Sequence, residues 1–149
     1  MKIDRKKITE YIKNNKMTVF AFAFLAASVL VIIFFGKITF EHNDSSFFVD
    51  AWFASEIEVP FDKVDSVSLS EEIDTGSRKS GMETGRVFVG TFQNTKYGSY
   101  SLYAYKNVKE YITVTFNGGT LVFNCSSEEK TIDAYYLILS KIKPKNDAE

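Results

Sequence analysis

Apolar and polar residues follow three successive patterns along the chain. The first is residues 17–36, MTVFAFAFLAASVLVIIFFG, which contain no charged side chain. A helix of this length rises about 1.5 Å per residue and spans roughly 30 Å, the thickness of a bilayer's hydrocarbon core. The end of the run, VIIFFGK, lacks the small residues of a signal-peptidase site. The pattern therefore predicts a transmembrane helix over 17–36 and favours an uncleaved anchor over a cleaved signal peptide.

The second pattern begins at Lys37 and consists of short β-rich runs. Aromatic and β-branched residues recur over five to eight positions, separated by Gly, Asn, Ser or Lys-Asn turn signals. In FNGGTLVF, Gly118 and Gly119 are expected to supply the positive φ values of a tight hairpin turn. The runs are KITFEH, SFFVDAWF, SEIEVPF, DKVDSVSLS, RVFVGTFQN, GSYSLYAYKN, EYITVTFN and TLVFNCS. We expect a small β-barrel of about seven strands.

The third pattern has helical spacing. Ser126 and Glu129 fit a capping box at a helix start, and Pro144 marks the end. The apolar residues between them recur three or four positions apart, as on one face of a helix. They are Ile132, Tyr135, Tyr136, Leu139 and Ile142. This stripe predicts an amphipathic C-terminal helix that caps the open end of the barrel.

Charge is distributed unevenly between the two ends of the chain. Residues 1–16 carry six Lys/Arg against two Asp/Glu, whereas residues 37–149 carry 12 Lys/Arg against 17 Asp/Glu. The basic flank predicts a single-pass protein of the cell membrane. Its N-terminus would be cytoplasmic and its β-rich domain extracytoplasmic. The flank either rests on anionic headgroups or serves only to set this orientation. An acidic domain without a basic stripe argues against nucleic acid as a partner.

These patterns divide the chain into four parts. We expect a basic cytoplasmic flank at 1–16, the transmembrane helix at 17–36, a β-rich domain at 37–143 and a flexible tail at 144–149. Such a protein would contact the lipid bilayer directly.

The residues offer little catalytic chemistry. His42 is the only histidine and Cys125 the only cysteine, so no catalytic triad, histidine-rich zinc site or intramolecular disulfide can be assembled. Gly76 and Gly81 have the spacing of a P-loop, but Met82-Glu83 stands where Lys-Ser/Thr is required, and a strand follows instead of a helix. We therefore expect no enzyme activity, no cofactor and no metal.

The order of strands followed by one helix resembles a pleckstrin-homology (PH)-like domain. The segments GSRKSG, GRVFVGTFQNTKYGSYSLYAYKN, YITV, LVFN and EEKTIDAYYLI are similar to a membrane-anchored family of bacterial PH domains. The resemblance covers about residues 38–142. It rests on Gly76, Arg78, Gly81, Gly90, Phe92, Gly98, Tyr100, Tyr103 and Tyr105. It implies the PH-like fold and a membrane location, without implying a ligand or an activity.

The segment TGSRKSGMETGR, residues 75–86, is expected to form a loop with two possible roles. In the functional interpretation, Arg78, Lys79 and Arg86 form a cationic rim that binds an anion, as eukaryotic PH domains bind phosphorylated headgroups. In the structural interpretation, the glycines let the chain bend and Arg78 pairs with nearby acids. The structural interpretation is favoured, because the acids around the loop nearly cancel its charge.

Tyrosines are concentrated between residues 97 and 105. Tyr103 and Tyr105 share one face of a strand, and Tyr97 lies beside a turn. Tyrosine suits a binding surface that is both apolar and hydrogen-bonding, but it is equally common in barrel walls. A core position is favoured over an aromatic binding surface.

Three functions remain open. The first is a non-catalytic interaction module that binds a protein partner, or a peptide along a strand edge or beside the C-terminal helix. The second is a module that binds an anionic lipid headgroup or envelope polymer through residues 76–86. The third, an enzyme, would need a cluster of titratable groups that the sequence does not reveal.

Overall fold

The computed structural model describes residues 13–52 and 54–142 of the 149-residue chain. The chain divides into two compact units, Met1–Phe35 and Gly36–Glu149. The predicted flank at 1–16 and tail at 144–149 fall largely or wholly outside the described residues, and these two parts of the division stay predictions.

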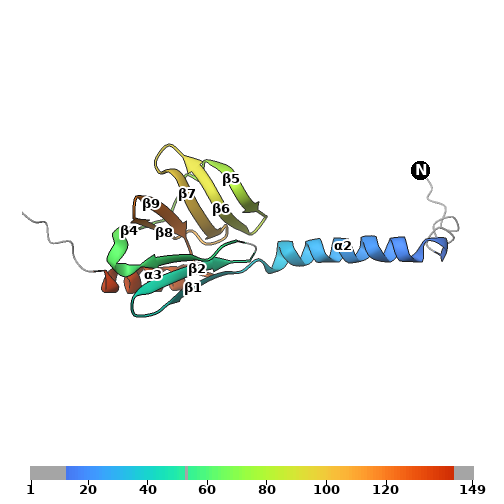
Figure 1. Cartoon of the computed structure of the whole chain (residues 1–149), viewed down its shortest axis with the longest axis horizontal. Coiled ribbons are helices and arrows are strands. Elements are labelled where there is room, and N and C mark those ends of the chain that lie inside the picture. The colour runs from blue at the N-terminus through green and yellow to red at the C-terminus, as the bar shows by residue number, and fades with distance from the viewer. Residues whose placement is uncertain (1–12, 53, 143–149) are drawn as a thin grey trace, which may run out of the picture. The chain divides into compact units, whose positions relative to one another are not determined.

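The first unit contains one described helix, α2 (Lys16–Phe35) (Figure 1). The Ser28 hydroxyl donates to the Phe24 carbonyl oxygen at 2.9 Å, so the hydroxyl is satisfied within the helix. A membrane span requires about 20 predominantly apolar residues. Among the described residues, no helix has the combination of length and apolar character needed to cross a bilayer. The prediction of a transmembrane helix at 17–36, and with it the single-pass membrane location, is contradicted by this finding.

The second unit is built mainly from β-strands in two sheets (Figure 1). The smaller sheet has the order β1-β2-β3 and the larger has the order β4-β8-β9-β7-β6-β5. The bounds are β1 (Ile38–His42), β2 (Ser46–Ala51), β3 (Ile57–Pro60), β4 (Val64–Ser70), β5 (Ser77–Glu83), β6 (Val87–Asn94), β7 (Gly98–Tyr105), β8 (Tyr111–Phe116) and β9 (Gly119–Phe123), with a short 3-10 helix at Phe61–Lys63.

Two features of the larger sheet correct the expected barrel of about seven strands. The segment expected to be a loop at 75–86 contains strand β5, which pairs with β6. Strand β9 lies between β8 and β7, antiparallel to the first and parallel to the second, with Leu102 opposite Val122. The described domain therefore has nine strands in two sheets rather than a single small barrel.

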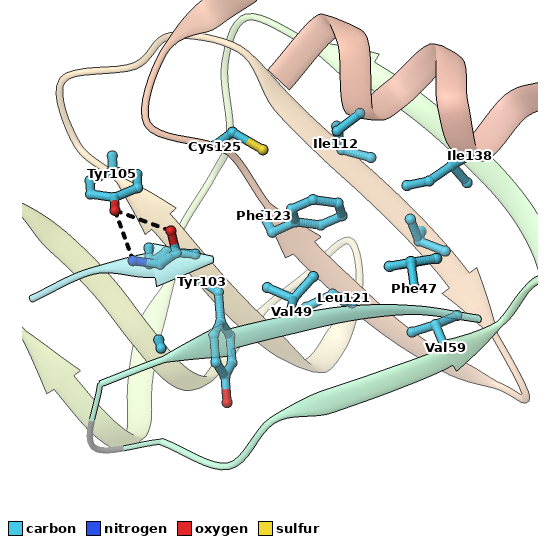
Figure 2. Packing of buried hydrophobic residues seen from close by; sticks show 14 of the residues in the cluster. Phe47, Val49, Val59, Tyr103, Tyr105, Ile112, Leu121, Phe123, Cys125 and Ile138 are labelled. Atoms are coloured by element: carbon cyan, nitrogen blue, oxygen red, sulfur yellow. Dashed lines mark hydrogen bonds between the residues drawn. The ribbon is translucent and has the colours of Figure 1, made fainter. Parts of the chain in front are cut away.

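The main core lies between the two sheets and the C-terminal helix (Figure 2). Phe47, Val49 and Val59 from the smaller sheet meet Leu121 and Phe123 from β9, and all five are fully buried. Because successive strand residues point to opposite faces, β7 also contributes to a second cluster on the far face of the larger sheet. That cluster consists of Phe92, Tyr100, Leu102, Ala104, Tyr111 and Val122. Strand β7 is thus buried on both faces.

The C-terminal helix, α3 (Glu128–Lys141), begins one residue later than the capping box predicted. Ser127, not Ser126, is the N-cap, and its hydroxyl accepts a hydrogen bond from the Lys130 amide at 3.3 Å. The buried face of the helix carries Thr131, Ala134 and Ile138. Tyr136 and Leu139, placed on the apolar stripe by the sequence, are 62% and 43% exposed.

The buried face of α3 differs from the predicted one because Thr131, a polar residue, is held in the interior by two hydrogen bonds. The Thr131 hydroxyl donates to the Ser127 carbonyl oxygen at 2.8 Å and accepts from the Cys125 amide at 3.0 Å. These bonds satisfy a buried threonine and allow the small residues Thr131 and Ala134 to face the sheets. The helix packs on β4 and β8, which confirms a C-terminal helix against the strands. Of the predicted stripe, Tyr135 and Ile142 pack against the core, whereas Tyr136 and Leu139 do not.

Candidate functional site

The tyrosines of β7 hold other parts of the domain through their hydroxyl groups. Tyr103 and Tyr105 lie in the core, 4% and 6% exposed, and share one face of β7 as expected. The Tyr103 hydroxyl donates to the Ser55 carbonyl oxygen at 2.8 Å. The Tyr105 hydroxyl accepts from the Ile38 amide at 2.8 Å and donates to the Ile38 carbonyl oxygen at 3.2 Å (Figure 2). These two side chains face the interior instead of a binding surface.

Tyr100 and Tyr97 lie at the other face of the larger sheet. The Tyr100 hydroxyl lies 3.0 Å from the Thr75 carbonyl oxygen and 3.3 Å from that of Asp74. Burial, reinforced by the charge of Asp74, raises the pKa of Tyr100 to about 12. Tyr97 is half-buried, packs edge-on against Tyr100 at a centroid distance of 5.3 Å, and has the Lys96 ammonium 4.9 Å from its ring centre. Of the three tyrosines considered for an aromatic surface, Tyr97 is the one with substantial exposure.

The cations of residues 75–86 are spread along an edge strand and the following turn. Arg78 and Lys79 are exposed on β5, where the register with β6 shifts between Arg78 and Ser80. Arg86 lies beyond the end of β5, in the turn where the Thr84 hydroxyl accepts its amide at 3.1 Å. Since a strand rises about 3.4 Å per residue, Arg78 and Arg86 are separated by most of the strand's length. The structure does not gather the three cations at one point.

Glycines in this segment have a structural role. Gly81 and Gly90 face each other across the β5–β6 ladder, with φ values of 94° and 135°. A Cβ atom at Gly81 would collide with the Val89 carbonyl oxygen, and one at Gly90 with the Ser80 carbonyl oxygen. Both the positive φ and the close approach of the two backbones therefore require glycine.

A groove of about 400 Å³ lies between strand β1 and helix α3. Residues 37–40 and His42 line one side, and Lys130, Asp133, Ala134 and Leu137 line the other. The helix residues are spaced three and four apart, so they share one face of α3. Strand and helix are thus brought together from opposite ends of the domain sequence.

The backbone of β1 presents an open edge. Lys37 accepts a hydrogen bond from Trp52 at 3.2 Å and Asn43 donates to Ser46 at 2.9 Å, so the odd-numbered residues of this segment pair with β2. In an antiparallel ladder the intervening residues direct their amide and carbonyl groups to the other side. Among the described strands β1 has only β2 as a neighbour. The backbone groups of Phe40 and His42 are therefore directed away from β2, at the edge that borders the groove.

The interior of the groove is apolar. The Phe40 ring stacks on Phe123, with centroids 5.7 Å apart, and Ala134 is buried beside the core. Cys125 is 9% exposed, and burial raises the pKa of its thiol to about 11, so the thiol is neutral at physiological pH. An apolar interior beside an open strand edge is suited to a peptide in extended conformation.

Charged residues stand at the rim and at one end of the groove. Lys37, Lys130 and Asp133 are exposed along its lining. At the far end of α3, the Lys141 ammonium lies 3.5 Å from the Asp44 carboxylate, which connects the helix to the β1–β2 turn. Strand β1 and helix α3 therefore run in the same direction, with Ile38 near the start of the helix and Asp44 near its end.

The sequence pattern did not identify this groove as a site. None of its lining residues was among the candidate binding residues, because β1 and α3 are separated by most of the domain in sequence. The signal was present only in a general form, as a strand edge and a C-terminal helix that could accept a peptide. Among the described residues, no cluster of three or more His, Cys, Asp or Glu side chains could hold a metal ion.

The comparison with protein families identifies the fold. A family model described as a bacterial PH domain matches residues 38–130, more than half of the 149-residue chain. The chain belongs to the bacterial PH domain family. This confirms the PH-like part of the resemblance; the membrane anchoring that the resemblance implied is not shown. Searches of curated proteins and of solved structures gave no significant match.

Family membership sets the broad functional class of this bacterial PH domain. PH domains are generally non-catalytic interaction modules that bind proteins or lipids. The family match spans β1 and reaches the first turn of α3, so it includes the strand side of the groove and the start of its helix side.

Proposed function

We propose that this bacterial PH domain binds an extended segment of a partner protein in the groove between β1 and α3. The observation that carries the proposal is the open edge of β1, with the backbone groups of Phe40 and His42 directed away from β2. A bound segment would add a fourth strand to the smaller sheet. Main-chain hydrogen bonds would supply affinity, and the apolar interior would select side chains.

The proposal is favoured over anion binding by residues 76–86 for a geometric reason. Arg78, Lys79 and Arg86 are distributed along β5 and its turn, whereas the groove brings a strand edge, apolar side chains and polar rim residues together. In this family, protein and lipid partners are both general possibilities, and the groove has the form of a peptide site.

The test uses a peptide selected against the full-length protein from a random heptapeptide display library. His42→Pro removes one amide donor from the outward edge but leaves the bonds to β2 in place, since proline is tolerated at strand edges. We expect His42→Pro to weaken binding of the selected peptide roughly 10-fold, the effect of losing one hydrogen bond and leaving its acceptor unsatisfied.

The matched control is His42→Ala, which removes the same side chain and keeps the amide. His42→Ala is expected to bind within about 2-fold of the parent protein, because the exposed imidazole contributes little. Equal loss in both variants would show that the side chain, not strand addition, mediates binding. A thermal unfolding curve for each variant verifies that the domain remains folded.

A further inference from the structure

The open part of the β1 edge is short and ends abruptly. The next outward-facing residue before Phe40 is Ile38, and both of its backbone groups are already bonded to the Tyr105 hydroxyl. A peptide strand added to β1 can therefore pair with Phe40 and His42 but cannot continue its ladder to Ile38. The bound chain must turn away at this point or end there.

The same end of the groove carries two cations. Lys37 directly precedes β1, and Lys130 lies in the first turn of α3. Asp133 lies one helical turn further along α3, toward the His42 end of the groove. The first turn of α3 also carries Glu128 and Glu129, but the lining of the groove at this end includes Lys37 and Lys130 and neither glutamate. Two lysines facing the groove, in a domain with 12 Lys/Arg against 17 Asp/Glu, favour an anionic group there.

The charges also select the direction of the bound chain. A strand that pairs antiparallel with β1 runs from His42 toward Ile38 and places its C-terminal side beside Lys37 and Lys130. A parallel strand would place its N-terminal side there, and a free ammonium would be repelled. The antiparallel arrangement thus matches both the hydrogen-bonding preference and the charge.

We infer, on the basis of the proposed function, that the groove recognises the free C-terminus of its partner. The terminal carboxylate lies at Lys37 and Lys130, where Tyr105 ends the ladder. The residue that pairs with Phe40 directs its side chain to the same face as Phe40, toward Ala134 and Leu137. The partner therefore carries an apolar residue within its last two positions.

The experiment compares two random heptapeptide libraries on the full-length protein, one displayed with free C-termini and one with both ends joined to the carrier. The strongest peptide from the free-end library is synthesised as the acid and as the C-terminal amide. We expect the acid to bind at least about 10-fold more tightly than the amide, as for loss of a charge-assisted hydrogen bond.

Lysine variants locate the carboxylate. The double variant Lys37→Ala/Lys130→Ala should reduce the ratio of the affinities for acid and amide from about 10-fold to about 1. Lys109→Ala, at an exposed lysine outside the groove, should change neither affinity. An increase in salt concentration should weaken binding of the peptide acid more than binding of the peptide amide.

The outcomes separate this inference from the proposed function. If acid and amide bind equally and both lose affinity in His42→Pro, the groove binds peptides but does not read a C-terminus, and the inference is overturned. If neither library yields a peptide that binds, the proposed function fails together with it.

Discussion

Strands β1 and β5 are both sheet edges, but they present their backbones differently. Strand β5 carries a register shift at Lys79, two adjacent cations and a glycine in a positive-φ conformation. Strand β1 pairs with β2 over all five residues without a shift and borders an apolar groove. Bulges and charged residues are the usual means by which proteins prevent edge strands from pairing with other chains. Of these two edges, β5 carries the protecting features and β1 does not.

The difference indicates what residues 75–86 do. Their basic side chains and glycines, which had suggested a ligand loop, are the features expected of a protected edge. Glu83 accepts a hydrogen bond from Lys106 at 2.8 Å, and this bond holds the pKa of Glu83 below its usual value. Lys106 also lies 4.3 Å from the centre of the Phe88 ring. The end of β5 therefore contacts the residue that follows β7, within the domain.

The largest effect should follow from disturbing the protected edge. Gly81→Val introduces a β-branched residue at φ 94° and a collision with the Val89 carbonyl oxygen. We expect a loss of about 3 kcal/mol or more in the free energy of unfolding, measured by urea denaturation. Gly85→Ala is the control, because a Cβ there meets no atom within 4 Å. Its effect should stay within about 0.5 kcal/mol, and similar losses in both variants would contradict the role given to Gly81.

A smaller loss in the free energy of unfolding is expected at Ile38, where the Tyr105 hydroxyl ends the accessible edge of β1. Tyr105→Phe leaves the Ile38 amide and carbonyl groups without their hydroxyl partner, in a buried position. This should reduce the free energy of unfolding by about 1–3 kcal/mol, the cost of leaving buried polar groups unsatisfied. Tyr136→Phe removes a hydroxyl from a tyrosine that is 62% exposed and should have almost no effect. Urea denaturation of the two variants gives the comparison.

Much of the fold was predictable from local pattern. Eight of the strands correspond to β-rich runs, because alternation and turn residues act over a few positions. The β8–β9 hairpin was expected at FNGGTLVF, although its positive φ values fall on Asn117 (47°) and Gly118 (75°), one residue earlier than predicted. The missing strand, β5, lacks an apolar face: six of its seven residues are exposed. Nothing in its composition distinguishes it from a loop.

The site was not predictable at the level of residues. Its two sides, β1 and α3, come from opposite ends of the domain sequence, and the sheet on which α3 packs contains a parallel β7–β9 pairing that has no local signature. The buried face of α3 was also misjudged, since Thr131 and Ala134 contribute less hydrophobicity than the exposed Tyr136 and Leu139. A transmembrane helix was expected from 17–36 by length and apolarity, and no described helix meets that requirement.

The smallest predicted effect concerns the Tyr100 hydroxyl, which bonds to the Asp74 and Thr75 carbonyl oxygens in the segment that leads into β5. Burial raises the pKa of Tyr100 to about 12, above its ordinary value near 10, so the folded domain holds this proton more tightly than the unfolded chain. The stabilisation is complete below pH 10 and is lost as the pH rises toward 12. As the phenol ionises it also ceases to donate to the Asp74 and Thr75 carbonyl oxygens.

Tyr100→Phe cannot ionise at this position, so its free energy of unfolding should fall less steeply between pH 9.5 and 11.5 than that of the parent protein. Burial also raises the pKa values of Tyr103 and Tyr111, but both tyrosines are present in both proteins, and the difference between the two curves isolates Tyr100. We expect that difference to change by about 1 kcal/mol over this range, because partial solvent screening reduces the full effect. Parallel curves would mean that the Tyr100 proton does not stabilise the approach to β5, and that this edge is held by its pairing with β6 and the Glu83–Lys106 contact.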